Sequence, residues 1–433
     1  MAAARVKVGA RPAAAVRAVE YGLLALLALM PFHAFLSVWF GSLIGHQSLI
    51  QAWKEGLLVV VVGLGGYLLW QEPIRRTRLR RPAVILAAAW VAVALVVTAA
   101  NRPALGEVVF GLKTDFEALV AFALALMVGR TALARRGGQI VLLAGVLVVA
   151  FAMAQAFLWP SDTLSHFGYN PSTIVPYQVV GGSGEYRFGG TLGGPNQLGT
   201  YLILIMALTL AVAVRRRRWW LLGLVPLAGV ALWHTYSRVA WLGAVVAVAV
   251  VAVGLTPRRW QAWAAGVMGL GVSIVAAGLA WAIGTKPAVR AALLHGSTTG
   301  APSSDSQHLA SLQTGLLQLA IKPWGHGLGT IGPATLQTAG HSDDGVIENY
   351  FLQVGYETGF VGLALFVAVC GAVAWDLARQ ASRRPLALGL LGALAGISVN
   401  ALVLPAWTDS TTALTFWILT GLVIGAAGET KRV

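Results

Sequence analysis

The stretch GVIENYFLQVGYETGFVGLALF, Gly345 to Phe366, begins as a polar loop and ends as apolar sequence of the kind that crosses membranes. It carries two carboxylates, Glu348 and Glu357, at the place where the chain is losing its polarity. An ionised residue at the centre of a membrane helix costs about 2.5–3.5 kcal/mol on insertion scales. Acidic side chains in such a place therefore need a functional or a structural reason.

The composition of the whole chain is that of a membrane protein. Of its 433 residues, 57% are hydrophobic and 11% are charged, and the mean hydropathy is +0.74, whereas a soluble domain carries roughly 25% charged residues. We therefore predict an all-α polytopic membrane protein with a single transmembrane domain over residues 1–433. The basic N-terminus runs into an apolar segment too long for the core of a signal peptide, so we expect no cleaved leader. The single cysteine, Cys370, excludes an internal disulfide and a CxxC metal site.

Apolar runs of about 17–25 residues predict twelve spanning helices. They lie near residues 19–42, 53–71, 83–100, 114–129, 139–158, 198–214, 219–235, 239–255, 260–283, 349–375, 385–403 and 413–428. Two long loops, at about 159–197 and 284–348, separate the fifth span from the sixth and the ninth from the tenth. Loops of this length are usually functional or disordered, and we expect these two to contain short helices.

The net charge of +15 is arranged as a topology signal. If the N-terminus is cytoplasmic, the segments on the inner side hold 23 of the 31 Lys and Arg residues, as the positive-inside rule predicts. Both termini are then cytoplasmic, and both long loops lie on the outer face. No basic patch alternates with stacking aromatic residues, so we expect a lipid bilayer as the partner and no nucleic acid. The basic residues left outside are Lys54, Arg102, Lys113, Arg187, Arg238, Lys286, Arg290 and Lys322.

The first long loop contains a candidate anion site. Arg187 lies in GEYRFGGTLGGPNQLG, whose glycines let a backbone approach a ligand closely. Pro195 and Asn196 precede the sixth span, so the N–H groups of a helix start point toward the same place. An Arg beside such a turn is typical of a clamp for an anion, and the alternative is a surface Arg in a structured loop.

Two further cations have unusual surroundings. Arg238 lies at the outer end of a span in HTYSRVAWLG, where an Arg needs a carboxylate or a ligand as partner. Tyr236 adds hydrogen-bonding capacity beside it, and the alternative is an Arg that extends to the interface. Lys113 lies in GLKTDFEAL, either as a second cation for a diphosphate or paired with Asp115 at a helix start.

The second long loop contains candidate acid–base residues. The amphipathic segment HLASLQTGLLQLAIKPW begins at His308 and predicts a helix on the membrane surface or capping the bundle. His341 follows in GHSDDG, and no spacing of His and Asp in this loop fits a standard metal-ligand motif, so we expect no metal and no cofactor.

The opening stretch then predicts a polar stripe on one helix. Asn349, Gln353 and Glu357 recur every four residues and so share one face of a helix that points into the bundle. Glu348 precedes this helix at the water boundary, where a carboxylate is placed to act as a general base. The alternative is a carboxylate that complements the positive end of the helix dipole.

These parts describe an outward-facing site with cations, one candidate base and an apolar bundle beneath. The cations would stabilise a diphosphate leaving group, and the bundle would hold a long isoprenoid tail. The outer face has no DxD motif and no visible nucleotide-sugar site, which favours a lipid-linked sugar donor. The competing hypothesis is a flippase or transporter of lipid-linked oligosaccharides, which should carry charges deep in its helices.

The sequence resembles the superfamily of O-antigen ligases and polymerases, which are integral-membrane glycosyltransferases. Four segments in order carry the resemblance: RFGGTLGGPNQLGTYL (187–202), YSRVAWLGAVVA (236–247), IKPWGHGLGT (321–330) and ENYFLQVGYETGFVGLALF (348–366). The resemblance implies a GT-C-type fold in the bacterial inner membrane. It also implies metal-independent, inverting transfer of a glycan from undecaprenyl diphosphate to a glycan or glycolipid acceptor.

The resemblance assigns roles to individual residues. Arg187 and Arg238 match the two arginines that contact the donor diphosphate in that family. The family's ligases carry His-Asn where this chain has Glu348-Asn349. Glu348 is then the expected base, with His308 and His341 as substitutes. The resemblance leaves open whether the acceptor is that of a polymerase or that of a ligase.

Overall fold

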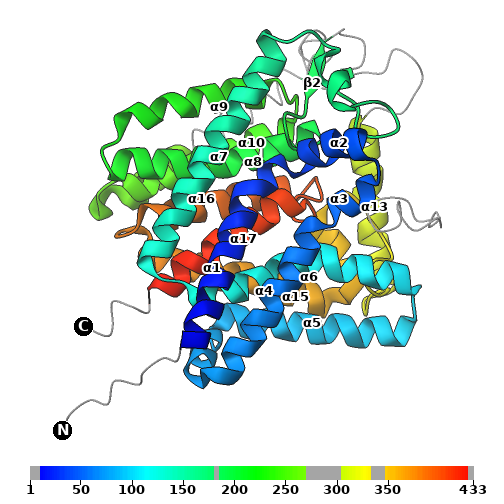
Figure 1. The fold of residues 1–433 in the computed structure, drawn as a ribbon, viewed down its shortest axis with the longest axis vertical. Coiled ribbons are helices and arrows are strands. Elements are labelled where there is room, and N and C mark those ends of the chain that lie inside the picture. The colour runs from blue at the N-terminus through cyan, green and yellow to red at the C-terminus, as the bar shows by residue number, and fades with distance from the viewer. Residues whose placement is uncertain (1–9, 180–184, 270–303, 333–346, 428–433) are drawn as a thin grey trace.

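The computed structural model describes residues 10–179, 185–269, 304–332 and 347–427. Most of these residues are helical, as Figure 1 shows. The first half of the chain contains α1 (Ala10–Leu29), α2 (His33–Ile44), α3 (Gln47–Gln51), α4 (Trp53–Gln71), α5 (Pro82–Asn101), α6 (Leu105–Val128) and α7 (Thr131–Phe157). The second half contains α8 (Pro195–Arg215), α9 (Leu224–Trp233), α10 (Arg238–Leu255), α13 (Ser304–Ile321), α15 (Tyr350–Ala381), α16 (Pro385–Asn400) and α17 (Ser410–Ala426).

The all-α membrane architecture is confirmed at the level of its helices. Within the described residues, seven helical segments are long and apolar enough to cross a membrane. Shorter apolar helices lie at the predicted spans 219–235, 385–403 and 413–428. The predicted span 260–283 runs beyond residue 269, outside the described residues, so the total of twelve crossings stays a prediction.

The predicted span 19–42 is two helices rather than one. A short 3-10 turn, η1 (Met30–Phe32), separates α1 from α2, with Pro31 in its first turn. The carbonyl oxygens that the break leaves open are used by other segments. The Thr411 hydroxyl donates to the Met30 carbonyl over 3.1 Å, and the Thr191 hydroxyl donates to the Pro31 carbonyl over 2.7 Å. The N-terminal segment is thereby attached to the Gly-rich turn that precedes α8.

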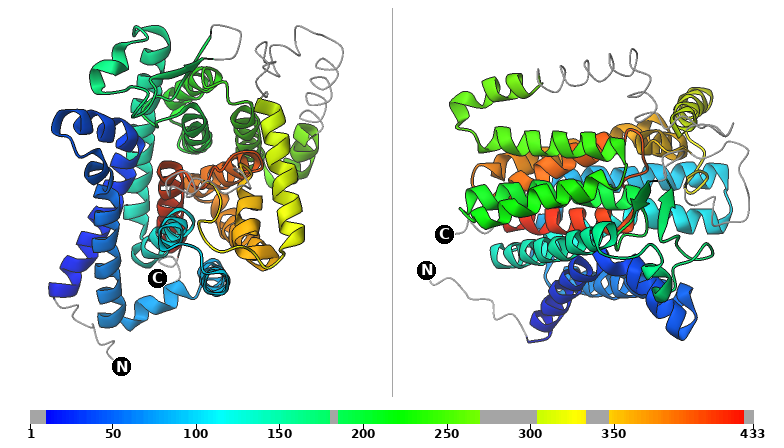
Figure 2. Two further views of the ribbon diagram at one scale, coloured as in Figure 1. Left: turned by 90° about the vertical axis from the view of Figure 1, so that its right-hand side faces the viewer. Right: turned by 90° about the horizontal axis from the view of Figure 1, so that it is seen from above.

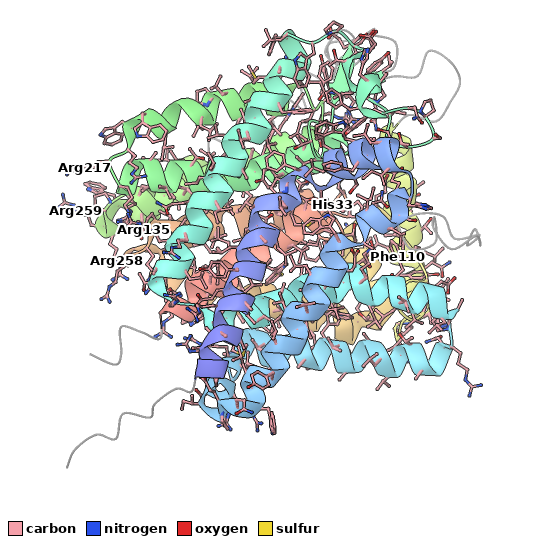
Figure 3. All side chains as sticks on the ribbon, in the orientation of Figure 1. His33, Phe110, Arg135, Arg217, Arg258 and Arg259 are labelled. Atoms are coloured by element: carbon pink, nitrogen blue, oxygen red, sulfur yellow. The ribbon has the colours of Figure 1, made fainter. Side chains whose placement is uncertain are left out.

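Many of the arginines gather at one end of the bundle. Arg135, Arg217, Arg258 and Arg259 all lie there in Figure 3, and α1 begins and α17 ends on the same side in Figure 1. We call this the basic end, and the end where α8, α10 and α15 begin the opposite end. The segments that the sequence analysis placed on the cytoplasmic side thus share one end of the molecule.

The core of the bundle is built around α17. All sixteen of its residues from Thr411 to Ala426 are buried, and the two views of Figure 2 show it surrounded by the other helices. Small residues let neighbouring backbones approach it closely. A Cβ atom added to Gly421 would lie 2.5 Å from the Phe122 carbonyl oxygen of α6. This contact requires glycine at position 421.

The first long loop contains a hairpin that the sequence analysis missed. Strands β1 (Tyr177–Val179) and β2 (Tyr186–Phe188) pair antiparallel, with Gln178 opposite Arg187. The expected short helix is also present, as the 3-10 helix η3 (Thr163–Phe167). The hairpin lies beyond the C-terminal end of α7 (Figure 1), so Arg187 is held on a strand rather than on an irregular turn.

Helix α15 is interrupted at Gly359. This residue has φ +70° and ψ −177°, a conformation that favours glycine. The carbonyl oxygens of Tyr356 and Glu357 accept hydrogen bonds from the N–H groups of His326 and Gly327, over 2.8 and 2.9 Å. The loop that follows α13 therefore supplies the donors that the helix itself lacks at the break.

Candidate active site

Arg187 joins three segments at the opposite end of the bundle. Its Nε donates to the Thr235 carbonyl oxygen over 2.8 Å, and its Nη2 donates to Asn196 Oδ1 over 2.9 Å. Thr235 lies in the turn between α9 and α10, and Asn196 lies in the first turn of α8. The half-buried guanidinium is thus fixed on the start of one helix and the approach to another.

Arg238 lies close enough to Arg187 for the two positive charges to interact. Burial, and then the neighbouring charge of Arg238, lower the pKa of Arg187 below its usual value. Arg238 is the first residue of α10, directly after the buried Ser237. Two cations held together beside a helix start both attract negative charge, so the arrangement favours a strongly anionic ligand.

The starts of α8 and α10 lie side by side. A Cβ atom added to Gly199 would lie 2.8 Å from the Cβ atom of Ala240, so only glycine permits this approach. Both helices therefore direct their first N–H groups toward the region of the two arginines. A helix start carries a partial positive charge, and two of them add to the attraction for an anion.

Tyr236 borders the same turn in an unusual backbone conformation. Its φ is +51°, which is uncommon for a residue other than glycine. Burial and the carboxylate of Glu185, which accepts a hydrogen bond from the phenol, raise the pKa of Tyr236. The phenol is therefore protonated at neutral pH and lies next to the hairpin that carries Arg187.

Glu348 lies at the start of α15, half-buried. Its backbone N–H donates to the Ser311 hydroxyl of α13 over 2.8 Å. Asn349 is the N-cap of α15, because its Oδ1 accepts from the Leu352 N–H over 3.0 Å. Its Nδ2 donates to the Leu402 carbonyl over 2.6 Å. Asn349 thus caps α15 and attaches it to the segment after α16, and its contact with substrate stays a prediction.

The polar stripe of α15 faces the bundle, as the sequence analysis predicted. Asn349, Gln353 and Glu357 are 8%, 1% and 1% exposed. The partner of Glu357 is Asp115 of α6, which forms a hydrogen bond with it and accepts another from the Tyr350 hydroxyl over 3.3 Å. Sequence reasoning missed this buried carboxyl pair, and the inward face of Glu357 was its only signal.

Lys113 lies in a separate charged cluster. Its Nζ is 2.6 Å from Glu55 Oε1 of α4, so its ion pair is not with Asp115, the alternative that its sequence neighbours suggested. Lys54 joins the cluster, with Nζ 2.9 Å from Glu55 Oε1 and 3.7 Å from Glu117 Oε2. The structure gives no contact between Lys113 and the arginine pair, and its role as a diphosphate ligand stays a prediction.

The histidine candidates lie mostly beyond what the structure describes. His341 is outside the described residues, and His308 is on α13 with its side chain outside them. His326 stacks on Tyr356 with ring centroids 3.9 Å apart, which makes it part of the contact at the break in α15. Within the described ranges no three His, Cys, Asp or Glu residues form a group that could hold a metal ion.

The apolar face of α13 is turned away from the protein. Leu309, Leu316, Leu317 and Ile321 are between 54% and 66% exposed. The other face packs on α15, where Leu319 contacts Leu352 and its neighbours. Of the two placements that the amphipathic pattern allowed, the exposed leucines favour contact with the membrane.

Residues 223–367 match the family model described as O-antigen ligase. The match supports a family of O-antigen ligase and polymerase-like proteins and confirms the resemblance drawn from the sequence. It covers α10 with Arg238, the loop after α13, and the start of α15 with Glu348, whereas Arg187 lies before it. No curated protein matches the chain.

Proposed function

We propose that this O-antigen ligase-like chain is a membrane glycosyltransferase that uses a polyprenyl-diphosphate-linked glycan as donor. The observation that carries the proposal is the convergence of Arg187 and Arg238 at the starts of α8 and α10. A diphosphate is the leaving group that such a pair stabilises best, because its charge grows as the bond to the sugar breaks. The apolar bundle beneath suits the isoprenoid chain of the donor.

The transfer itself needs one base and no redox chemistry. The acceptor hydroxyl oxygen forms a bond to the anomeric carbon while the bond from that carbon to the diphosphate oxygen breaks. The diphosphate leaves with the bonding electrons, and the hydroxyl proton passes to the carboxylate of Glu348. Attack from the side opposite to the diphosphate inverts the configuration at the anomeric carbon.

The acceptor is a glycan or a glycolipid that binds at the end of the bundle opposite to the basic end. We place this end on the outer face of the inner membrane, because the basic end meets the positive-inside rule for the cytoplasm. The enzyme is a surface-polysaccharide polymerase or an O-antigen-type ligase. Comparing surface glycans of cells with and without the gene separates the two, since loss of long chains indicates a polymerase and unattached long chains indicate a ligase.

The proposal is tested by following donor consumption with purified protein in nanodiscs. Arg187→Ala and Arg238→Ala should each lower turnover by at least about a hundredfold, by analogy with removal of one donor that stabilises an oxyanion. Each variant should still insert and elute as the wild type does. Wild-type turnover in either variant would remove that arginine from the site. Turnover should also survive EDTA, and a metal-dependent rate would contradict the direct mechanism.

A further inference from the structure

A pocket at the basic end is rimmed by arginines from three segments. It has a volume of about 260 Å³ and lies between α7, the end of α8, and the turn that joins α15 to α16. Its arginines are Arg135, Arg216, Arg218, Arg383 and Arg384. The proposed reaction uses none of them, because they lie at the end of the bundle opposite to Arg187 and Arg238.

The pocket has an excess of positive charge that its own lining does not balance. Among the described residues that line it, there is no Asp or Glu. Arg384 has a structural task, since it donates to the carbonyl oxygens of Val423 and Ala426 over 3.3 and 3.1 Å. Arg135, Arg216 and Arg383 are exposed. Arginines gathered in this way are suited to the paired oxygens of a phosphate.

The floor of the pocket is mostly apolar. Leu142, Val212, Leu386 and Val423 line the pocket, and its polar residues besides the arginines are Thr131 and Gln139. From Arg135 to Leu142 helix α7 rises about 10 Å, at 1.5 Å per residue. This depth corresponds to the headgroup and the first part of the chains of a lipid. A small water-soluble anion would gain nothing from contact with apolar side chains at this depth.

The surroundings place the rim at the level of lipid headgroups. Trp219 and Trp220 directly follow Arg218 and are 58% and 74% exposed. Exposed tryptophans next to arginines at the end of a bundle are typical of the membrane–water interface. Basic pockets between spanning helices on the cytoplasmic side are suited to anionic headgroups.

We propose that this pocket binds an anionic glycerophospholipid of the cytoplasmic leaflet. Its phosphate lies among the arginines of the rim, and the upper part of its acyl chains lies against Leu142 and Val423. The bound lipid connects α7, α8 and α16 and relieves the mutual repulsion of their arginines. The protein should therefore be more stable in anionic membranes than in zwitterionic ones.

The chain offers a closely matched pair of variants. Arg135→Gln/Arg216→Gln/Arg218→Gln removes three charges from the rim. Arg136→Gln/Arg217→Gln/Arg259→Gln removes three charges from the same end of the bundle, two of them from neighbouring positions, and none of these three residues lines the pocket. Both variants lose the same net charge, so a difference between them reports the pocket itself.

The test is native mass spectrometry of the whole purified chain during titration with phosphatidylglycerol or phosphatidylcholine. Phosphatidylglycerol should bind saturably to the wild type, and its affinity should fall about tenfold or more in the pocket variant. The control variant should keep its affinity within about twofold of the wild type. Equal binding of phosphatidylcholine, or equal loss in both variants, would overturn the proposal.

Two further measurements separate other outcomes. Glycerol phosphate, which has the headgroup without the chains, should compete only weakly; competition as strong as that of the lipid would indicate a soluble anion site instead. If the pocket variant does not fold, the proposal is tested on the thermal stability of the wild type alone. Its thermal midpoint should rise when phosphatidylglycerol replaces phosphatidylcholine at constant ionic strength, and an unchanged midpoint would contradict the site.

Discussion

The side-chain amide of Asn400 donates a 2.6 Å hydrogen bond to the hydroxyl oxygen of Thr200. Both side chains are buried, and the bond ties the end of α16 to the first turns of α8. The Thr200 hydroxyl in turn donates to the Asn196 carbonyl oxygen over 2.8 Å. Since the Asn196 side chain accepts from Arg187, the position of that guanidinium depends on α16.

The residues after Asn400 make the same connection to the other half of the candidate site. The carbonyl oxygen of Ala401 accepts from the Tyr350 N–H over 3.0 Å, and that of Leu402 accepts from the Asn349 amide. One helix end thus connects the arginine pair with the start of α15, where Glu348 lies.

Replacing Asn400 with Ala should therefore affect both stability and turnover. The loss of a buried hydrogen bond lowers the free energy of unfolding by about 1–3 kcal/mol. Turnover should fall as well, because α8 is then free to move and carries Asn196, the partner of Arg187. Unfolding of Asn400→Ala, Thr200→Ala and the double variant in mixed micelles gives the coupling energy, which should be about 1 kcal/mol. Thr209→Val is the control, because the hydroxyl of this buried α8 residue makes no hydrogen bond within the described structure. A coupling energy near zero would contradict the connection.

The role of Glu348 is separable from its place in the fold. Glu348→Gln keeps the size of the side chain and the backbone bond to Ser311, but it removes the group that accepts the proton. Turnover should fall by about 10²–10⁴-fold, the usual contribution of a general base, while Glu348→Asp keeps part of it. Donor binding, measured separately, should be unchanged in both variants. If Glu348→Gln turns over donor as the wild type does, the base is elsewhere and His308 and His341 are tested next.

The buried pair of Asp115 and Glu357 should tolerate an amide but not a hydrocarbon. A hydrogen bond between two carboxyl groups requires a proton on one of them, and Asp115 already accepts from Tyr350. Glu357→Gln supplies an N–H donor in place of that proton, so its free energy of unfolding should stay within about 1 kcal/mol of the wild type. Glu357→Leu leaves the Asp115 carboxyl buried without this partner and should cost about 3 kcal/mol. Equal losses in the two variants would show that the hydrogen bond is not what matters.

The break in α15 should be sensitive to a single methyl group. Gly359→Ala forces a positive φ on an L-residue and brings its Cβ to 2.5 Å from the Pro323 carbonyl oxygen. We expect a loss of more than about 1 kcal/mol in the free energy of unfolding. Gly371→Ala on the same helix meets no atom within 4 Å and should be neutral or stabilising by up to about 1 kcal/mol. Thermal unfolding of the two variants measures the difference, and the prediction is wrong if they behave alike.

Features that follow from the spacing of nearby residues could be predicted from the sequence. Helices occur where long apolar runs occur, because lipid leaves the backbone few other ways to satisfy its hydrogen bonds. The inward stripe of Asn349, Gln353 and Glu357 follows from a spacing of four residues. Arg187 and Arg238 were expected in one outward-facing site, because both are cations on the outer side and both match the family's diphosphate-contacting arginines. The hydrogen bonds that hold Arg187 to Thr235 and Asn196 were not predicted.

Features that depend on distant segments could not be predicted. Lys113 has Asp115 as its sequence neighbour, yet its ion pair is with Glu55, because the packing of α4 on α6 decides which carboxylate lies in reach. The hairpin of β1 and β2 is too short to leave an alternating pattern. The break at Gly359 also depends on a distant segment, because the loop after α13 supplies the donors that α15 lacks there.

The break at Gly359 can form only after the chain has been synthesised well past the loop that supplies its hydrogen bonds. Pro323 to Gly327 leave the ribosome about thirty residues before Tyr356 and Phe360, so both the donors and the acceptor at the break exist before the second half of α15 is made. None of these groups has its partner until Tyr356 to Phe360 are made, so the loop after α13 and the break in α15 have to take up their positions together, as one unit of folding.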